Sequence, residues 1–120
     1  MRVEAGEESF EIDADLSSIQ YLLGSLIGCL NATTSMVARE MCVDIEAIDA
    51  EVEGDVDYSR FKAEDTNARA GLQEVRVELT VDADTDRETL EGLLAAVEER
   101  CPVSETLANG TDLGVSVESA

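Results

Sequence analysis

Three cysteines are the residues of this chain best suited to chemistry: Cys29, Cys42 and Cys101. The chain has no histidine, which excludes Ser-His-Asp and Cys-His catalysis and the usual zinc sites. Three cysteines without a CxxC spacing also make a poor metal site. What remains is thiol chemistry, in which the thiolate is the reactive form.

The three cysteines lie in different sequence settings. Cys29 lies within a long apolar segment, where a free cysteine is most often a small core hydrophobe. Cys101 lies between Arg100 and Pro102, at a predicted junction of two helices, where the N–H groups of the second helix would favour a thiolate. Cys42 follows the first predicted helix and is interpreted as incidental. The settings favour Cys101 over Cys29 as a reactive thiol, and inert thiols stay an alternative.

Other kinds of site match the sequence poorly. The run Asp82-x-Asp84-x-Asp86 begins like a calcium loop, but Arg87 replaces the turn glycine and Leu93 replaces the bidentate glutamate. The acidic run is better interpreted as a strand end and a helix cap. Glycine-rich phosphate loops are absent. We therefore expect neither a metal nor a cofactor.

The charge of the chain is strongly acidic. It has 28 Asp and Glu against 8 Lys and Arg, a formal net charge of −20, and Lys62 is the single lysine. Nucleic acids and anionic membranes are therefore poor partners, because both need clustered cations. Self-repulsion at this charge destabilises a fold in dilute salt, and high salt screens it. This composition favours a halophilic, saline cytoplasm over an ordinary acidic surface.

The expected location is cytoplasmic. The N-terminus lacks an apolar targeting segment, and the longest apolar stretch, YLLGSLIGCL, is too short to span a bilayer. An odd number of cysteines without a secretory signal favours free thiols in a reducing compartment.

The elements that must position the cysteines follow from the apolar periodicity. The pattern predicts one α+β domain over residues 1–120. Its predicted elements are a hairpin over 2–13, a helix over 17–41, strands over 48–56 and 75–82, a helix ending near 100, a short helix over 103–108, and a last strand with Leu113, Val115 and Val117 on one face. Residues 57–73 are predicted to form a loop.

Two local signals refine these elements. Gly24, Gly28 and Ala32 form a stripe of small residues on the long helix, which predicts that another backbone passes close by, because glycine within a helix is otherwise unfavourable. Thr85 and Glu88 have the spacing of a capping box, which would start the second helix.

Two motifs carry a resemblance to a known family. The resemblance is carried by the stretch QYLLGSLIGCLNATTSMVAREM, the alternating charged strand that follows it, and then ERCPVSETL. The chain resembles the family of osmotically inducible protein C and organic hydroperoxide resistance proteins (OsmC/Ohr), and in particular its short archaeal-type members. The resemblance covers roughly residues 9–118 in the same order. It implies antiparallel sheets around long central helices in an intertwined homodimer, with active sites at the subunit interface.

The resemblance also implies roles for two cysteines. Cys29 would attack the O–O bond of an organic hydroperoxide and become a sulfenic acid. Cys101 would condense with it to a disulfide, which a dithiol reductant reopens. The implied partners are a small hydroperoxide, an unknown dithiol and a second copy of the chain. The implied activity is a thiol-dependent peroxidase in oxidative stress defence.

The chain departs from the family at the groups that activate the first thiol. Ile19 stands where the most active members have a glutamate, and their upstream arginine has no clear counterpart. Arg69 and Arg100 are the candidate cations that would stabilise a thiolate. These departures motivate an alternative function, in which a dimer of the same fold binds a small apolar ligand without turnover.

Overall fold

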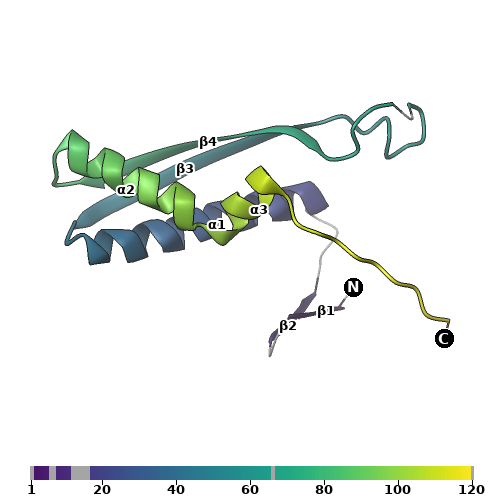
Figure 1. The fold of residues 1–120 in the computed structure, drawn as a ribbon, viewed down its shortest axis with the longest axis horizontal. Helices are drawn as coiled ribbons and strands as arrows, with labels where there is room; N and C mark the ends of the chain where they lie inside the picture. Colours follow the sequence, from purple (N-terminus) through teal and green to yellow (C-terminus); the bar gives the residue numbers. More distant parts are fainter. Residues whose placement is uncertain (1, 6–7, 12–16, 66, 120) are drawn as a thin grey trace.

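The computed structural model describes residues 2–5, 8–11, 17–65 and 67–119 (Figure 1). The α+β class predicted from the sequence is confirmed. The elements in chain order are β1 (Arg2–Ala5), β2 (Glu8–Glu11), α1 (Ser18–Glu40), β3 (Ile45–Val56), β4 (Leu72–Ala83), α2 (Arg87–Arg100) and α3 (Pro102–Asn109). β1 pairs with β2 and β3 pairs with β4, both antiparallel. The predicted turn of the first hairpin and its end at 12–13 lie outside the described residues.

Both ends of α1 are fixed by local hydrogen bonds. Ser17 and Gln20 form a capping box, in which the Gln20 N–H donates to the Ser17 hydroxyl and the Ser17 N–H donates to the Gln20 side chain. At the other end, the N–H groups of Cys42 and Val43 donate to Arg39 and Ala38 in a Schellman arrangement. Cys42 takes the left-handed position with φ of 57°, where glycine is usual, so its backbone serves to end the helix.

The hairpin of β3 and β4 carries one apolar face toward α1. Val52 pairs with Val77, and Ala50 pairs with Leu79, across the two strands. A β-carbon placed at Gly54 would lie 2.8 Å from Leu72 Cδ2 and 3.3 Å from Leu23 Cδ1. Gly54 thus allows α1 to approach the hairpin closely.

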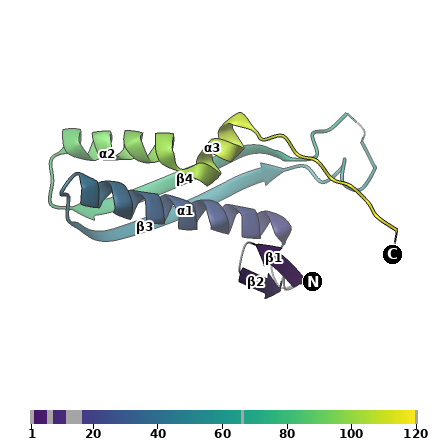
Figure 2. The same ribbon diagram turned by 60° about the horizontal axis from the view of Figure 1, so that its bottom comes forward.

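The core is small and centred on α1, which contacts β3 on one flank and α2 and α3 on the other (Figure 2). Leu93 and Val97 of α2 are almost fully buried, and they hold α2 against α1. The buried apolar residues are Leu26, Leu30, Val37, Ala38, Leu93, Val97 and Cys101. The core therefore joins the middle of α1 to the junction between α2 and α3.

Asp86 caps α2, so the predicted capping box of Thr85 and Glu88 is wrong. The Thr89 N–H donates to the Asp86 carboxylate at 2.7 Å, and this bond lowers the pKa of Asp86. A carboxylate is a stronger acceptor than a hydroxyl at the positive end of a helix, which explains the one-residue difference.

The predicted last strand is also wrong for the single chain. Residues 110–119 have no secondary structure, and Figure 1 shows them extending away from the rest of the chain. Leu113, Val115 and Val117 are 83–93% exposed. A strand needs a neighbouring strand for its hydrogen bonds, and no described strand runs beside this segment.

The small-residue stripe on α1 is similarly uncovered. Among the described residues, no atom outside the neighbouring helix backbone lies within 4 Å of a β-carbon added at Gly24 or Gly28. The described part of the chain therefore does not supply the second backbone that was expected there.

The chain exposes more surface than a folded monomer of its mass. Its accessible surface is 9328 Å², whereas the scaling for compact monomers gives about 6,300 Å². Its radius of gyration is 17.7 Å, against about 13.6 Å expected for this length. Apolar surface that a compact monomer would bury is therefore left open.

By length and composition, α1 could also cross a membrane. Its most apolar 18-residue window has a mean hydropathy of 1.3, and a third of that window is buried in the structure. Core helices of soluble proteins pass the same test, so this criterion does not separate the two.

The acidic hairpin leads to a prediction about salt. Glu51 faces Glu78 directly across β3 and β4, and like charges at such positions are destabilising. In urea titrations at low salt, we expect Glu51→Lys to raise the free energy of unfolding by about 0.2–1 kcal/mol. Glu51→Gln should raise it by less, because it removes the repulsion without adding an attraction. The wild type should also be stabilised between about 0.1 M and 1 M KCl, and the advantage of Lys over Gln should shrink. Equal stability of the two variants at low salt would contradict the repulsion.

Candidate active site

The fold brings Cys29 and Cys101 into contact within one chain. Their Sγ atoms lie 3.1 Å apart, with the Cys101 thiol donating to Cys29, although 72 positions separate them in sequence. Cys29 projects from the middle of α1 and is partly exposed, whereas Cys101 is fully buried where α2 ends and α3 begins. No bond joins the two sulfurs, and their separation puts a disulfide within reach.

The N-terminus of α3 supplies donors to both sulfurs. Pro102 occupies the first turn, and no side chain caps this helix end. The Val103 N–H acts to lower the pKa of Cys29, and the N–H groups of Ser104 and Val103 act in the same direction on the pKa of Cys101. Unsatisfied N–H groups at a helix start favour negative charge, so the sulfurs occupy the place of the missing cap.

The Cys29 thiol is the more acidic of the two. Partial burial by itself raises the pKa of Cys29, but hydrogen bonds from the Val103 N–H, from the Cys101 thiol and with Thr33 outweigh burial, so its pKa lies below the ordinary value. The Thr33 hydroxyl lies 4.0 Å from the Cys29 sulfur, one helical turn along α1. The local hydrogen bonds therefore favour a thiolate on the more accessible cysteine.

Cys101 behaves in the opposite way. Burial raises its pKa, and its hydrogen bond to Cys29 raises the pKa further, because this thiol acts as the donor. Bonds from the N–H groups of Ser104 and Val103 oppose these effects only in part. Cys29 is therefore the thiol of the pair that loses its proton more readily.

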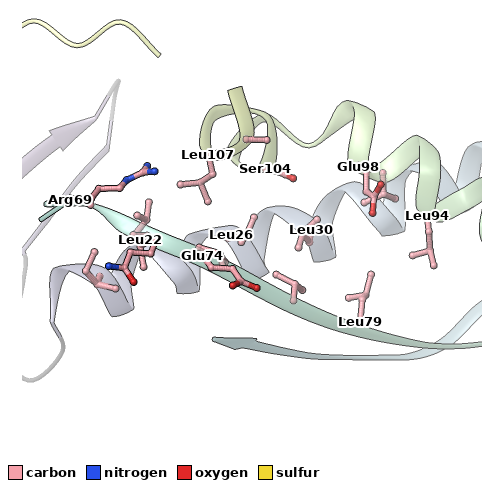
Figure 3. Close-up of a pocket in the computed structure, with 18 residues that line it drawn as sticks. Leu22, Leu26, Leu30, Arg69, Glu74, Leu79, Leu94, Glu98, Ser104 and Leu107 are labelled. Atoms are coloured by element: carbon pink, nitrogen blue, oxygen red, sulfur yellow. The ribbon is translucent and has the colours of Figure 1, made fainter. Parts of the chain in front are cut away.

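The two candidate cations lie in different surroundings. Arg100 directs its guanidinium to Glu40, with contacts of 2.6 and 3.1 Å. Arg69 lines one end of an apolar groove, near Leu22 and Leu107 (Figure 3). The lowered pKa of Cys29 has hydrogen bonds as its cause, so a thiolate-stabilising role for Arg69 or Arg100 stays a prediction.

The groove is a half-open apolar cavity of about 720 Å³ beside the thiols. Its floor is α1, and its walls are β4 on one side and α2 and α3 on the other (Figure 3). Cys29 and Cys101 do not line it. Leu26 and Leu30 from α1, with Val97 and Ser104 near Cys101, do, so the groove and the thiol pair share one part of the core.

Sequence reasoning missed the groups that hydrogen-bond to Cys29. Thr33 is four residues after Cys29, the spacing that places two side chains on one face of a helix, so this contact had a detectable signal. Pro102 at a helix start indicated where the Val103 N–H would lie. Only the tertiary fold shows that this N–H reaches Cys29.

The hydrogen bond between the thiols leads to a testable shift. Cys101→Ala removes the S–H donor, so the pKa of Cys29 should rise and its alkylation by iodoacetamide should follow a profile displaced to higher pH. The rate at Cys29 is measured by mass spectrometry of its peptide, with Cys42→Ser as the matched control that leaves the profile unchanged. A profile that is unmoved, or moved to lower pH, would show that Cys101 does not stabilise the thiolate.

Comparisons with known proteins concern the family and the fold of the chain. The profile described as OsmC-like protein matches residues 11–116. A crystal structure of an OsmC-like protein from Mycoplasma pneumoniae superposes with a TM-score of 0.73 at 19% identity, covering 90% of this chain and 78% of that one. A protein from Psychrobacter arcticus, named for osmotic stress induction and a detoxification response, gives a TM-score of 0.61 at 20% identity, covering 91% and 71%.

A comparison with curated protein sequences gave no match. At these low identities, the similarity to the two solved structures concerns the fold alone. The profile match extends over most of the sequence and includes both cysteines of the contacting pair. The chain therefore belongs to the OsmC-like protein family.

Proposed function

We propose that this protein is a thiol-dependent peroxidase that reduces organic hydroperoxides through Cys29 and Cys101. The observation that carries the proposal is the contact of 3.1 Å between the two sulfurs, on a partly exposed and a buried cysteine. The family match and the similarity in fold to a protein named for a detoxification response support the same conclusion.

In the first step the Cys29 thiolate attacks one oxygen of the hydroperoxide and breaks the O–O bond. The sulfur is oxidised to a sulfenic acid, and the other oxygen leaves as an alkoxide that takes a proton and becomes an alcohol. The Val103 N–H and Thr33, which hydrogen-bond to Cys29, hold the thiolate ready. A partly exposed position gives the substrate access to Cys29.

In the second step Cys101 attacks the sulfenic sulfur, releases water and forms a disulfide. Its thiol is already beside Cys29, so the two sulfurs need to approach by only about 1 Å, given an S–S bond of about 2.05 Å. An external dithiol then reduces the disulfide by exchange and is itself oxidised to a disulfide. No metal or cofactor takes part in this cycle.

The proposed assembly is a cytoplasmic homodimer suited to high salt. The large accessible surface, the uncovered Gly24 and Gly28 and the exposed apolar residues of the C-terminal segment support a second copy that covers these surfaces. The net charge of −20 supports stability in a saline medium. The same charge opposes binding to nucleic acids and anionic membranes.

A second candidate function follows from the groove. Its lining is mostly apolar, and its volume of about 720 Å³ lies within the range of small-molecule sites. In this alternative, a dimer binds a small apolar ligand there and the thiols do not turn over. Cys29 that stays reduced in excess hydroperoxide, together with a copurified apolar ligand, would favour the alternative.

The peroxidase is tested by thiol titration. Cumene hydroperoxide should consume two thiols per chain in a Cys42→Ser background and form the Cys29–Cys101 disulfide. Cys29→Ser should reduce turnover to the uncatalysed rate, because the nucleophile is lost. Cys101→Ser should stop after one turnover, with a sulfenic acid on Cys29 that dimedone traps. Unchanged thiols in the wild type would refute the proposal.

The homodimer is tested by sedimentation equilibrium. The wild type should sediment with twice the chain mass, and the double variant Val115→Asp, Val117→Asp should weaken dimerisation at least about tenfold, because charges replace apolar side chains at a buried contact. Thr111→Asp is the control that adds charge to the same segment at a polar position. A monomeric wild type contradicts the dimer, and an unaffected double variant removes the C-terminal segment from the interface.

A further inference from the structure

An ion pair joins the ends of two helices next to the thiol pair. Glu40 is the last residue of α1, and Arg100 is the last residue of α2. Arg100 Nη1 lies 2.6 Å from Glu40 Oε2, and Arg100 Nη2 lies 3.1 Å from Glu40 Oε1. Each nitrogen thus meets its own oxygen, the bidentate geometry that fixes orientation as well as distance.

Between Val97 and Cys101, the last turn of α2 carries no buried side chain. Val97 is the final buried residue of this helix, and Glu98, Glu99 and Arg100 are exposed. Two carboxylates near a helix C-terminus are unfavourable, because the carbonyl ends there already carry partial negative charge. Arg100 supplies the cation for this end, and its pair with Glu40 ties the turn to α1.

The position of Cys101 depends on this last turn of α2. Its N–H donates to the Val97 carbonyl at 2.9 Å, and its carbonyl accepts from the Glu105 N–H at 3.0 Å. The backbone of Cys101 thus belongs to the end of α2 and to the start of α3. Where α2 ends relative to α1 therefore decides how far the Cys101 sulfur lies from Cys29, which is fixed on α1.

We propose that Glu40, acting through Arg100, is a positioning residue that holds Cys101 against Cys29. This inference rests on the proposed function, since it concerns how readily the same two sulfurs form a disulfide. The ion pair raises the effective concentration of one sulfur at the other, as positioning contacts do. Arg100 thus acts on the thiol pair through the backbone of Cys101.

The expected effect is modest, because both side chains are about half exposed, at 41% and 51%. Surface ion pairs of this kind change an equilibrium by up to about fivefold. Glu40→Gln and Arg100→Gln should each lower the equilibrium constant for the Cys29–Cys101 disulfide by about this factor. For a two-electron couple, a fivefold change raises the midpoint potential by about 20 mV.

The test measures that potential directly. Wild type and variants, all in a Cys42→Ser background, are equilibrated in dithiothreitol or glutathione redox buffers, quenched by alkylation and weighed by mass spectrometry. Arg87→Gln is the matched control, because it removes an ion pair with Glu91 within α2 and should leave the potential unchanged. Urea titration of each reduced protein separates a loss of positioning from a loss of global stability.

The two single variants test the inference independently, even where one of them folds poorly. The double variant Glu40→Gln, Arg100→Gln should be no worse than either single variant, because both break the same pair. The swapped variant Glu40→Arg, Arg100→Glu should recover part of the loss. Potentials of the single variants equal to the wild type, no recovery in the swap, or an equal loss in Arg87→Gln would overturn the inference.

The proposed function can fail separately. The midpoint potential of the disulfide could shift as expected in the variants while cumene hydroperoxide fails to form the disulfide in the wild type. That result would support the positioning role and refute the peroxidase. Rapid oxidation by the hydroperoxide with unmoved potentials would do the reverse. A wild-type chain that forms no disulfide in any buffer would overturn both.

Discussion

The contact between the Cys29 and Cys101 sulfurs is the constraint on which the candidate site depends. It requires the middle of α1 to meet the junction of α2 and α3, and the small core of buried leucines and valines is arranged around this meeting. Leu93 and Val97 press α2 against α1, while Pro102 starts a new helix directly after the second thiol. The core that stabilises the fold and the geometry that positions the sulfurs are thus the same set of contacts.

Hydrogen bonds lower the pKa of Cys29. They come from the Val103 N–H, from the Cys101 thiol and from Thr33, and they outweigh the opposing effect of partial burial. An uncapped helix N-terminus offers N–H groups without adding a side chain, which suits a chain of only eight cations. Arg100 forms an ion pair with Glu40, and its proposed role is to position Cys101.

The open surfaces of the single chain have a common physical meaning. Three features of the chain expose apolar or backbone surface that a folded protein normally covers. They are the groove beside the thiols, the uncovered Gly24 and Gly28 of α1, and the extended C-terminal segment. Their burial by a second copy would lower the exposed surface toward that of a compact protein. Strong acidity works against such association at low salt, because two copies of a chain with a net charge of −20 repel one another. Salt concentration would then control both folding and assembly.

The sequence by itself determined the helices, the strands on either side of residues 57–73 and the residues able to do chemistry, because apolar periodicity and the absence of histidine are local facts. It also placed Pro102 at a helix start. Only the tertiary structure decided that Cys101 contacts Cys29, that the Val103 N–H lowers the pKa of Cys29 and that Arg100 pairs with Glu40. These residues are 60 or more positions apart in sequence. The predicted last strand failed for the same reason, since an alternating pattern cannot show whether a neighbouring strand is present.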